Sequence, residues 1–324
     1  MVILRILEDK NIIFDSPVIL NFNNVVKIIK AKVKGRISKW CSIILNPKDK
    51  VVRHYYVGIC AIFKNEACYL TEWLEYHRTI GVEHFWLYNN FSGDDYKSVL
   101  EPYIQNDIVT LIEWPRKQGQ VSAYEHCIKN FRFEAQWIGF IDLDEFIVPI
   151  KCNKINNYLK QYERKCGSIY IYWKMFGSSG KERRENGGLV IEDFVVCWEK
   201  LTAIGKSFWN TKYEYDFSHK TSLPHEVWTT EKGIHLPPIN QFGNAIGSEI
   251  NFVREYKVDI QINHYFSKTY EEYKKKYSRG DAIFKKNPRD DKYFRKHELH
   301  NISSNYAIYK YIIEVKKRIK KISE

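Results

Sequence analysis

The stretch that decides the fold is residues 137–146, which read WIGFIDLDEF. We expect residues 137–141 to form a buried strand because they are bulky and apolar around a single glycine. Side chains alternate faces along a strand, so Asp142 and Asp144 should point the same way while Leu143 faces the core. Two such carboxylates repel unless a cation lies between them, and oxygen-rich sites suit Mg²⁺ or Mn²⁺. The motif therefore predicts a metal site, with a solvated strand end as the alternative.

Stretches typical of strands and of helices alternate on both sides of this motif. Such alternation predicts an α/β fold, in which a mostly parallel sheet carries helices on both faces. The pattern fades after about residue 177, and the later part of the chain is expected to be irregular. The predicted strands are 55–63, 84–88, 108–114, 137–141 and 168–173, and the predicted helices are 66–80, 94–105, 122–133 and 153–164.

Polar clusters follow the predicted parallel strands at residues 64–66, 89–90 and 142–145. Ligands of parallel sheets bind beyond the carboxyl ends of the strands, so these clusters should converge although they are far apart in sequence. Asn89 belongs to the second cluster, and Gln120 follows the third strand at the same edge. We expect both to lie near a bound ligand.

The first cluster, Lys64, Asn65 and Glu66, ends a strand and opens a helix. Its amide and carboxylate could grip a uracil or a ribose. They could equally cap the helix and place an acid in its first turn.

A later strand, predicted within residues 258–266, places His264 at the end of its apolar face. A neutral imidazole suits Mn²⁺, so His264 is either a third metal ligand or a buried core histidine. Thr269 and Glu272 form a plausible capping box for the helix that follows. Most cations of that helix should be solvated, but Lys274 and Arg279 are candidates for binding a diphosphate.

The composition bounds the class of protein. The 324 residues are 44% hydrophobic, enough for one large domain or two joined ones, and the net charge is +12. The excess of Lys and Arg favours an anionic partner such as a membrane surface or a phosphorylated small molecule, although compositional bias also contributes. No recognised nucleic-acid-binding motif accompanies the charge, so we expect no nucleic-acid partner.

Several other classes lack support in the sequence. It contains no GxGxxG after a strand, no GxxxxGK[ST] and no GxSxG. The seven cysteines show no zinc spacing and fit reduced thiols, while no long apolar run or signal peptide is visible. We therefore expect a cytoplasmic protein, peripheral on the inner face of the plasma membrane if its basic ends bind lipid.

Several motifs, in order, resemble those of glycosyltransferase family 92. Bacterial families of the GT-A type share the KNE and DLDEF blocks. The motifs lie at residues 60–66 (CAIFKNE), 72–77 (EWLEYH), 81–85 (GVEHF), 137–146 (WIGFIDLDEF), 176–180 (FGSSG), 263–266 (NHYF) and 279–281 (RGD).

The resemblance implies a GT-A fold, with a Rossmann-like donor half joined to an acceptor half. It implies inverting transfer of a sugar, typically galactose from UDP-galactose, with Mn²⁺. Asp142 and Asp144 match the metal-binding DxD motif, His264 matches a histidine that completes the metal site, and residues 64–66 match the donor block. The implied role is bacterial surface polysaccharide or lipopolysaccharide synthesis on a saccharide or glycolipid acceptor. A non-catalytic sugar-binding module or a membrane-associated assembly partner is the alternative.

The catalytic base is expected on the acceptor side, where a carboxylate would take the proton of the attacking hydroxyl. Glu192 is the first candidate and Asp193 the second. Asp193 stands where the family often has arginine, so this segment departs from the family's pattern. The predicted organisation is a basic segment (1–50), a donor half (51–177), an acceptor half (178–290) and a basic helical tail (291–324).

Overall fold

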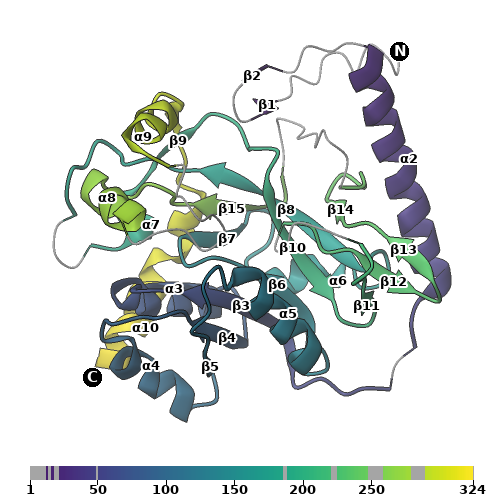
Figure 1. The fold of residues 1–324 in the computed structure, drawn as a ribbon, viewed down its shortest axis with the longest axis horizontal. Helices are drawn as coiled ribbons and strands as arrows, with labels where there is room; N and C mark the ends of the chain where they lie inside the picture. The colour runs from purple at the N-terminus through teal and green to yellow at the C-terminus, as the bar shows by residue number, and fades with distance from the viewer. Residues whose placement is uncertain are drawn as a thin grey trace.

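The computed structural model describes residues 12–13, 16–17, 22–48, 50–184, 188–219, 225–246, 258–278 and 289–323. Its centre is a nine-stranded sheet, to which residues from both predicted halves contribute (Figure 1). The order is β5-β4-β3-β6-β10-β8-β15-β7, and β14 also pairs with β8. The bounds are β5 Val109–Glu113, β4 His84–Asn89, β3 Tyr55–Phe63, β6 Ala135–Phe140, β10 Gly205–Asn210, β8 Ser168–Met175, β15 Ile260–His264, β7 Glu145–Pro149 and β14 Ile239–Asn240.

The first four strands of this order run parallel, as the alternation of strands and helices predicts. β10 then enters antiparallel between β6 and β8, while β15 pairs parallel with β8 and antiparallel with β7. The sheet is thus a Rossmann-like parallel half that continues into a mixed half. The predicted α/β fold, with a mostly parallel sheet and helices on both faces, is confirmed.

Helices cover both faces of the sheet. Along β3, Ile59 and Ala61 pack with α3 and α4, whereas Cys60 packs with α5 on the other face. The helices are α2 Phe22–Leu45, α3 Ala67–Thr79, α4 Tyr96–Gln105, α5 Gln120–Phe131, α6 Ile155–Lys160, α7 Val190–Asp193, α8 Tyr270–Ser278, α9 Asp291–Glu298, the 3-10 turn η1 Ala307–Tyr311, and α10 Ile312–Ser323.

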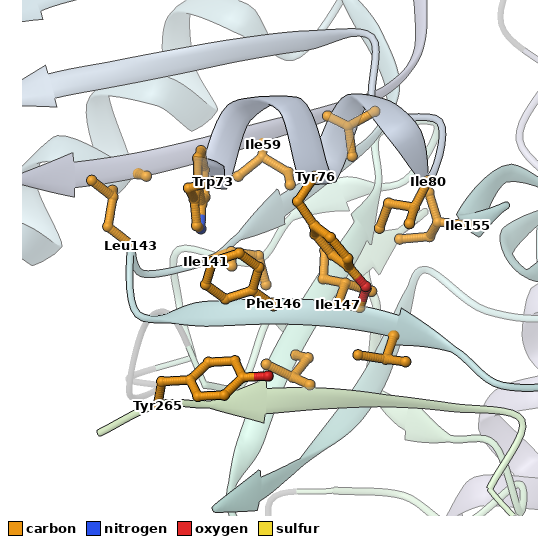
Figure 2. Close-up of a cluster of buried hydrophobic side chains, with 14 of the residues drawn as sticks. Ile59, Trp73, Tyr76, Ile80, Ile141, Leu143, Phe146, Ile147, Ile155 and Tyr265 are labelled. Carbon is orange, nitrogen blue, oxygen red and sulfur yellow. The ribbon is translucent and has the colours of Figure 1, made fainter. Parts of the chain in front are cut away.

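The main core lies beneath α3. Figure 2 shows Trp73 and Tyr76 of α3 above Ile141 and Phe146, with Tyr265 on the other side of β7. The Tyr76 hydroxyl donates to the Ile147 carbonyl at 2.7 Å, which fixes the helix to β7. This packing holds the residues on either side of the acidic motif in place.

Short strands replace long elements in the later part of the chain. Each is too short to show a periodicity that sequence could reveal, because its pairing depends on distant residues. The predicted helix 153–164 is shorter in the structure, as α6. The short strands are β11 Glu214–Tyr215, β12 Thr229–Glu231 and β13 Ile234–Leu236 in one sheet, β9 Val196–Trp198 with β16 Asn301–Ser304, and β1 Ile12–Ile13 with β2 Ser16–Pro17.

The C-terminal helix α10 packs on α3, and Val315 is fully buried there. Helix α2 lies on the opposite side of the molecule (Figure 1). Within the described residues, none of the helices combines the length and the apolarity needed to cross a membrane.

Candidate functional site

The acidic motif occupies a turn between β6 and β7. β6 ends at Phe140, and the backbone N–H of Glu145 donates to the Asp142 carbonyl at 3.0 Å, which closes the turn. The Trp73 indole N–H donates to the carbonyls of Asp142 (3.2 Å) and Glu145 (2.9 Å). The strand ends before the two aspartates, as predicted, and Leu143 is buried as expected, but strand alternation does not apply to Asp142 and Asp144. The turn, rather than strand alternation, sets the direction of the carboxylates.

Asp142 is held by three side chains. Lys206 of β10 donates to Oδ2 at 2.7 Å, while Gln120 Nε2 (3.0 Å) and the Tyr124 hydroxyl (3.1 Å) donate to Oδ1. Burial opposes ionisation, but the Lys206 ammonium outweighs it and holds the pKa of Asp142 below its usual range. The carboxylate is charged and fixed in direction.

Asp144 lies beside His264 and Lys276. The Lys276 ammonium of α8 contacts Oδ2, and His264 Nε2 lies 3.6 Å from Oδ1. His264 arrives there because β15 pairs antiparallel with β7, which places it opposite Glu145. Against the effect of burial, Lys276 and His264 hold the pKa of Asp144 well below its usual range. Burial lowers the pKa of His264, and the neighbouring Asp144 carboxylate opposes this shift.

Glu145 is an internal anchor of the turn. Its side chain is fully buried, Oε2 accepts from the backbone N–H of Asp142 at 3.1 Å, and Lys206 lies 3.5 Å from Oε1. Burial raises the pKa of this carboxyl well above its usual range. Lys206, which is 1% exposed, thus bridges two carboxylates of the same turn.

The predicted metal ligands are only partly assembled. Asp144 and His264 present a carboxylate oxygen and an imidazole nitrogen to each other, a pair of ligand types that suits Mn²⁺. Asp142 is turned toward Lys206 instead. In the described part of the chain, no three His, Cys, Asp or Glu side chains form a ready-made metal cluster. The oxygen and nitrogen ligands present here fit a divalent ion, and two of them, from Asp144 and His264, already lie side by side.

The first polar cluster lies directly after β3, at the predicted edge. Asn65 adopts a positive φ of 53° and accepts from the Gly93 N–H at 2.8 Å, so it fastens the neighbouring loop. Glu66 occupies the N-cap position of α3 but makes no side-chain cap. Lys268 lies 3.9 Å from Glu66 Oε2, and its charge also lowers the pKa of Asp144. Lys268 therefore links Glu66 to the acidic turn. Lys64 lies in the bend between β3 and α3.

Asn89 is buried, and its side chain forms hydrogen bonds with other residues of the protein. Its amide donates to the Tyr96 hydroxyl (2.8 Å) and to Glu113 (2.7 Å), and its oxygen accepts from the Ser92 N–H at 3.0 Å. This bonding indicates that Asn89 shapes the loop after β4.

Three other predicted residues make their contacts away from the acidic turn. Lys274 is exposed, with its ammonium 4.6 Å from the centre of the Tyr270 ring. Glu192 pairs with Lys316 at 2.6 Å. The carboxylate of Asp193 pairs with Lys181, and Arg279 lies outside the described residues.

Sequence reasoning missed Lys206, Lys276, Tyr124 and His225. His225 Nδ1 donates to the Gly205 carbonyl at 2.8 Å, so Nε2 keeps its lone pair. Burial and the nearby Lys206 ammonium lower its pKa to about 4, and its ring lies 5.2 Å from that of Trp173, which also contacts His264. A lysine inside an apolar strand was the one signal for Lys206, and spacing along α8 could have indicated Lys276 as readily as Lys274.

Comparison with known proteins gives a consistent result. The model of glycosyltransferase family 92 matches residues 53–309. A family 92 protein of Ricinus communis is 33% identical over 82% of this chain and 46% of its own length. One of Oryza sativa subsp. japonica is 28% identical over 52% of this chain and 31% of its own. The chain thus spans less than half the length of these relatives.

Two further likenesses are more distant. Galactan beta-1,4-galactosyltransferase GALS3 of Arabidopsis thaliana is 30% identical over 36% of this chain and 26% of its own length. The crystal structure of S. aureus TarS with UDP has a TM-score of 0.33 and 14% identity over 52% of each chain, a likeness too weak to carry an argument. By the extent of the family match, this chain belongs to glycosyltransferase family 92.

Proposed function

We propose that the chain is a metal-dependent inverting glycosyltransferase. In this proposal it moves a hexose, galactose from UDP-galactose, onto a saccharide or glycolipid acceptor in the synthesis of a surface polysaccharide. The observation that carries it is the buried acidic turn at the carboxyl edge of β6, with His264 beside Asp144. Family membership supports sugar transfer, and the names of the Arabidopsis relatives support galactose and a saccharide acceptor.

The divalent ion, Mn²⁺ or Mg²⁺, would be held by Asp144 and His264, with Asp142 as the third ligand. When bound, it supplies Lewis-acid stabilisation of the charge that develops on the UDP leaving group. Lys206 keeps Asp142 ionised and in place through its 2.7 Å contact. Lys276 already lies at Asp144, where its ammonium can turn to a phosphate oxygen of the donor.

The donor nucleotide is proposed to lie along the edge formed by the ends of β3 and β4. Lys64, Asn65 and Glu66 line this edge, and Asn89 shapes the loop beside it. Gln120 contributes through its hydrogen bond to Asp142. Lys274 and Arg279 remain proposals for the diphosphate.

The acceptor hydroxyl needs a base that takes its proton as it attacks the donor sugar. Glu192 and Asp193 remain the proposed candidates, and each would have to leave its lysine partner. His225 adds a candidate that lies closer to the acidic turn, because its Nε2 is unprotonated at neutral pH.

The direct test is Asp144→Ala in a UDP-galactose transfer and hydrolysis assay with added Mn²⁺. We expect turnover to fall at least a hundredfold, since the variant removes a carboxylate next to the leaving group. Asp95→Ala is the matched control, because that acid is exposed and makes no side-chain cap. Wild-type turnover in Asp144→Ala ends the proposal. UDP binding by the unaltered chain without turnover and without dependence on Mn²⁺ would instead indicate a binding module.

A further inference from the structure

Helix α2 packs on the body of the protein through its small residues. Ala31, Gly35, Ser38 and Ser42 recur at helical spacing and are all buried. A Cβ atom at Gly35 would come within 2.1 Å of the Gly243 carbonyl oxygen, so the helix backbone lies directly against the chain beneath it. Small side chains at these four positions therefore let the helix approach the body of the protein closely.

Ile28 is also buried, but five other large apolar side chains of α2 lie on the opposite face, exposed to solvent. They recur at intervals of three or four residues, which places them in one stripe along the helix. At 100° per residue, the centre of this stripe lies nearly opposite the buried small residues. The stripe consists of Ile29 (43% exposed), Val33 (49%), Ile37 (56%), Trp40 (70%) and Ile44 (72%).

Cations border the stripe on both sides. The helix contains six Lys and Arg residues and no acid in 24 residues. The same helical angles place Lys30 and Lys34 along one flank, and Lys32 and Lys39 along the other. An apolar stripe with Trp, bordered by cations, is typical of helices that lie in the plane of a membrane interface.

The basic C-terminal helix provides a contrast. α10 turns its apolar residues inward, since Val315 is fully buried and Ile312 is 8% exposed. Ile313, at 72%, is its large exposed apolar side chain. The apolar face of α10 is therefore already covered, whereas the side chains in the stripe of α2 remain 43–72% exposed.

We propose that α2 docks the protein on an anionic lipid bilayer, with the stripe among the acyl chains and the flanking cations at the headgroups. Charge selects this occupant over a second copy of the chain. Two copies meeting at this face would bring six cations against six, with no acid on either helix. An anionic bilayer supplies both apolar depth and negative charge. The proposal does not depend on the proposed enzyme activity.

The test is sedimentation of the full chain with phosphatidylcholine vesicles that contain or lack phosphatidylglycerol. We expect binding to the anionic vesicles only. Ile44→Ser should weaken it about tenfold, and Ile313→Ser should leave it unchanged although both side chains are 72% exposed. Lys30→Gln with Lys34→Gln should also weaken binding and reduce its dependence on salt.

Tryptophan fluorescence gives an independent readout. Eight of the nine tryptophans are buried and Trp40 is 70% exposed, so quenching by acrylamide reports on Trp40. Anionic vesicles should shift its emission to the blue and protect it from quenching. Absence of binding to anionic vesicles, or equal losses in the Ile44 and Ile313 variants, would overturn the proposal. Protection of Trp40 that grows with protein concentration without lipid would overturn it in favour of a second copy.

Discussion

Lys206→Met tests whether one buried lysine holds the acidic turn together. Methionine keeps the length and the apolar stem of the side chain but removes the ammonium. That ammonium lies 2.7 Å from Asp142 Oδ2 and 3.5 Å from Glu145 Oε1, and its side chain is 1% exposed. The variant therefore leaves two neighbouring carboxylates without their shared cation.

The size of the effect follows from the burial of the two acids. Removing one partner of a buried ion pair costs about 3–5 kcal/mol. Asp142 is 30% exposed and can regain some hydration, whereas Glu145 is fully buried. We therefore expect a loss near the lower limit, about 3 kcal/mol, which corresponds to a melting temperature lower by roughly 4–5 °C for a chain of 324 residues.

Circular dichroism during urea and thermal unfolding measures the loss, with Lys165→Met as the control because Lys165 is exposed. Adding Glu145→Gln to Lys206→Met also removes the second acid that contacts this lysine. The double variant should therefore recover about 1–2 kcal/mol relative to the sum of the single changes. Additive effects, or a loss below about 1 kcal/mol in Lys206→Met, would refute the role given to this lysine.

Three further predictions concern single side chains. Lys276→Met should strengthen binding of Mn²⁺ alone roughly fivefold and weaken UDP binding, because the ammonium no longer competes at its carboxylate. Calorimetry with Lys274→Met as an unchanged control checks this, and equal effects of the two variants would contradict it. Glu192→Gln should bind donor normally and lose transfer at least a hundredfold, whereas unchanged transfer would rule out Glu192 and leave Asp193 and His225 as candidates. Burial raises the pKa of Glu72 from 4.5 to about 7, so the folded state holds a proton that the unfolded chain has released. Stability should then fall by about 3 kcal/mol between about pH 4.5 and 7, and a pH series of urea unfolding that keeps this slope in Glu72→Gln would be inconsistent with the assignment.

The parallel half of the fold could be predicted because each of its elements has a local signal. The apolar run that forms β3 and the periodic helix α3 are recognisable without their neighbours. The mixed half could not be predicted, because a strand such as β14 has two residues and exists only through its pairing with β8. Short elements of this kind are set by long-range contacts that a single sequence does not display.

The acidic motif could be placed at the end of a parallel strand from the sequence pattern, whereas only the resemblance to family 92 connected His264 with it, because β15 belongs to the mixed half. The lysines that pair with these carboxylates could not be identified from the sequence. Lys206 lies on β10, which enters between β6 and β8 from the opposite direction, and this pairing brings its side chain to Asp142. Lys276 differs from Lys274 only by its place on α8.

The two aspartates of the motif are held in different ways, and the difference assigns them different tasks. Asp142 receives hydrogen bonds on both oxygens from Lys206, Gln120 and Tyr124, which come from one strand and one helix of the scaffold. A carboxylate bound on both sides is a fixed point of the turn. Asp144 contacts Lys276 of α8 through Oδ2, and its Oδ1 lies 3.6 Å from His264 Nε2, which is longer than a hydrogen bond. At Asp144 a ligand would displace the partly exposed Lys276, whereas at Asp142 it would compete with the buried Lys206, although the Asp142 side chain is itself the more exposed of the two (30% against 9%). For this reason we expect Asp144 to dominate ligand affinity and Asp142 to dominate the stability of the turn.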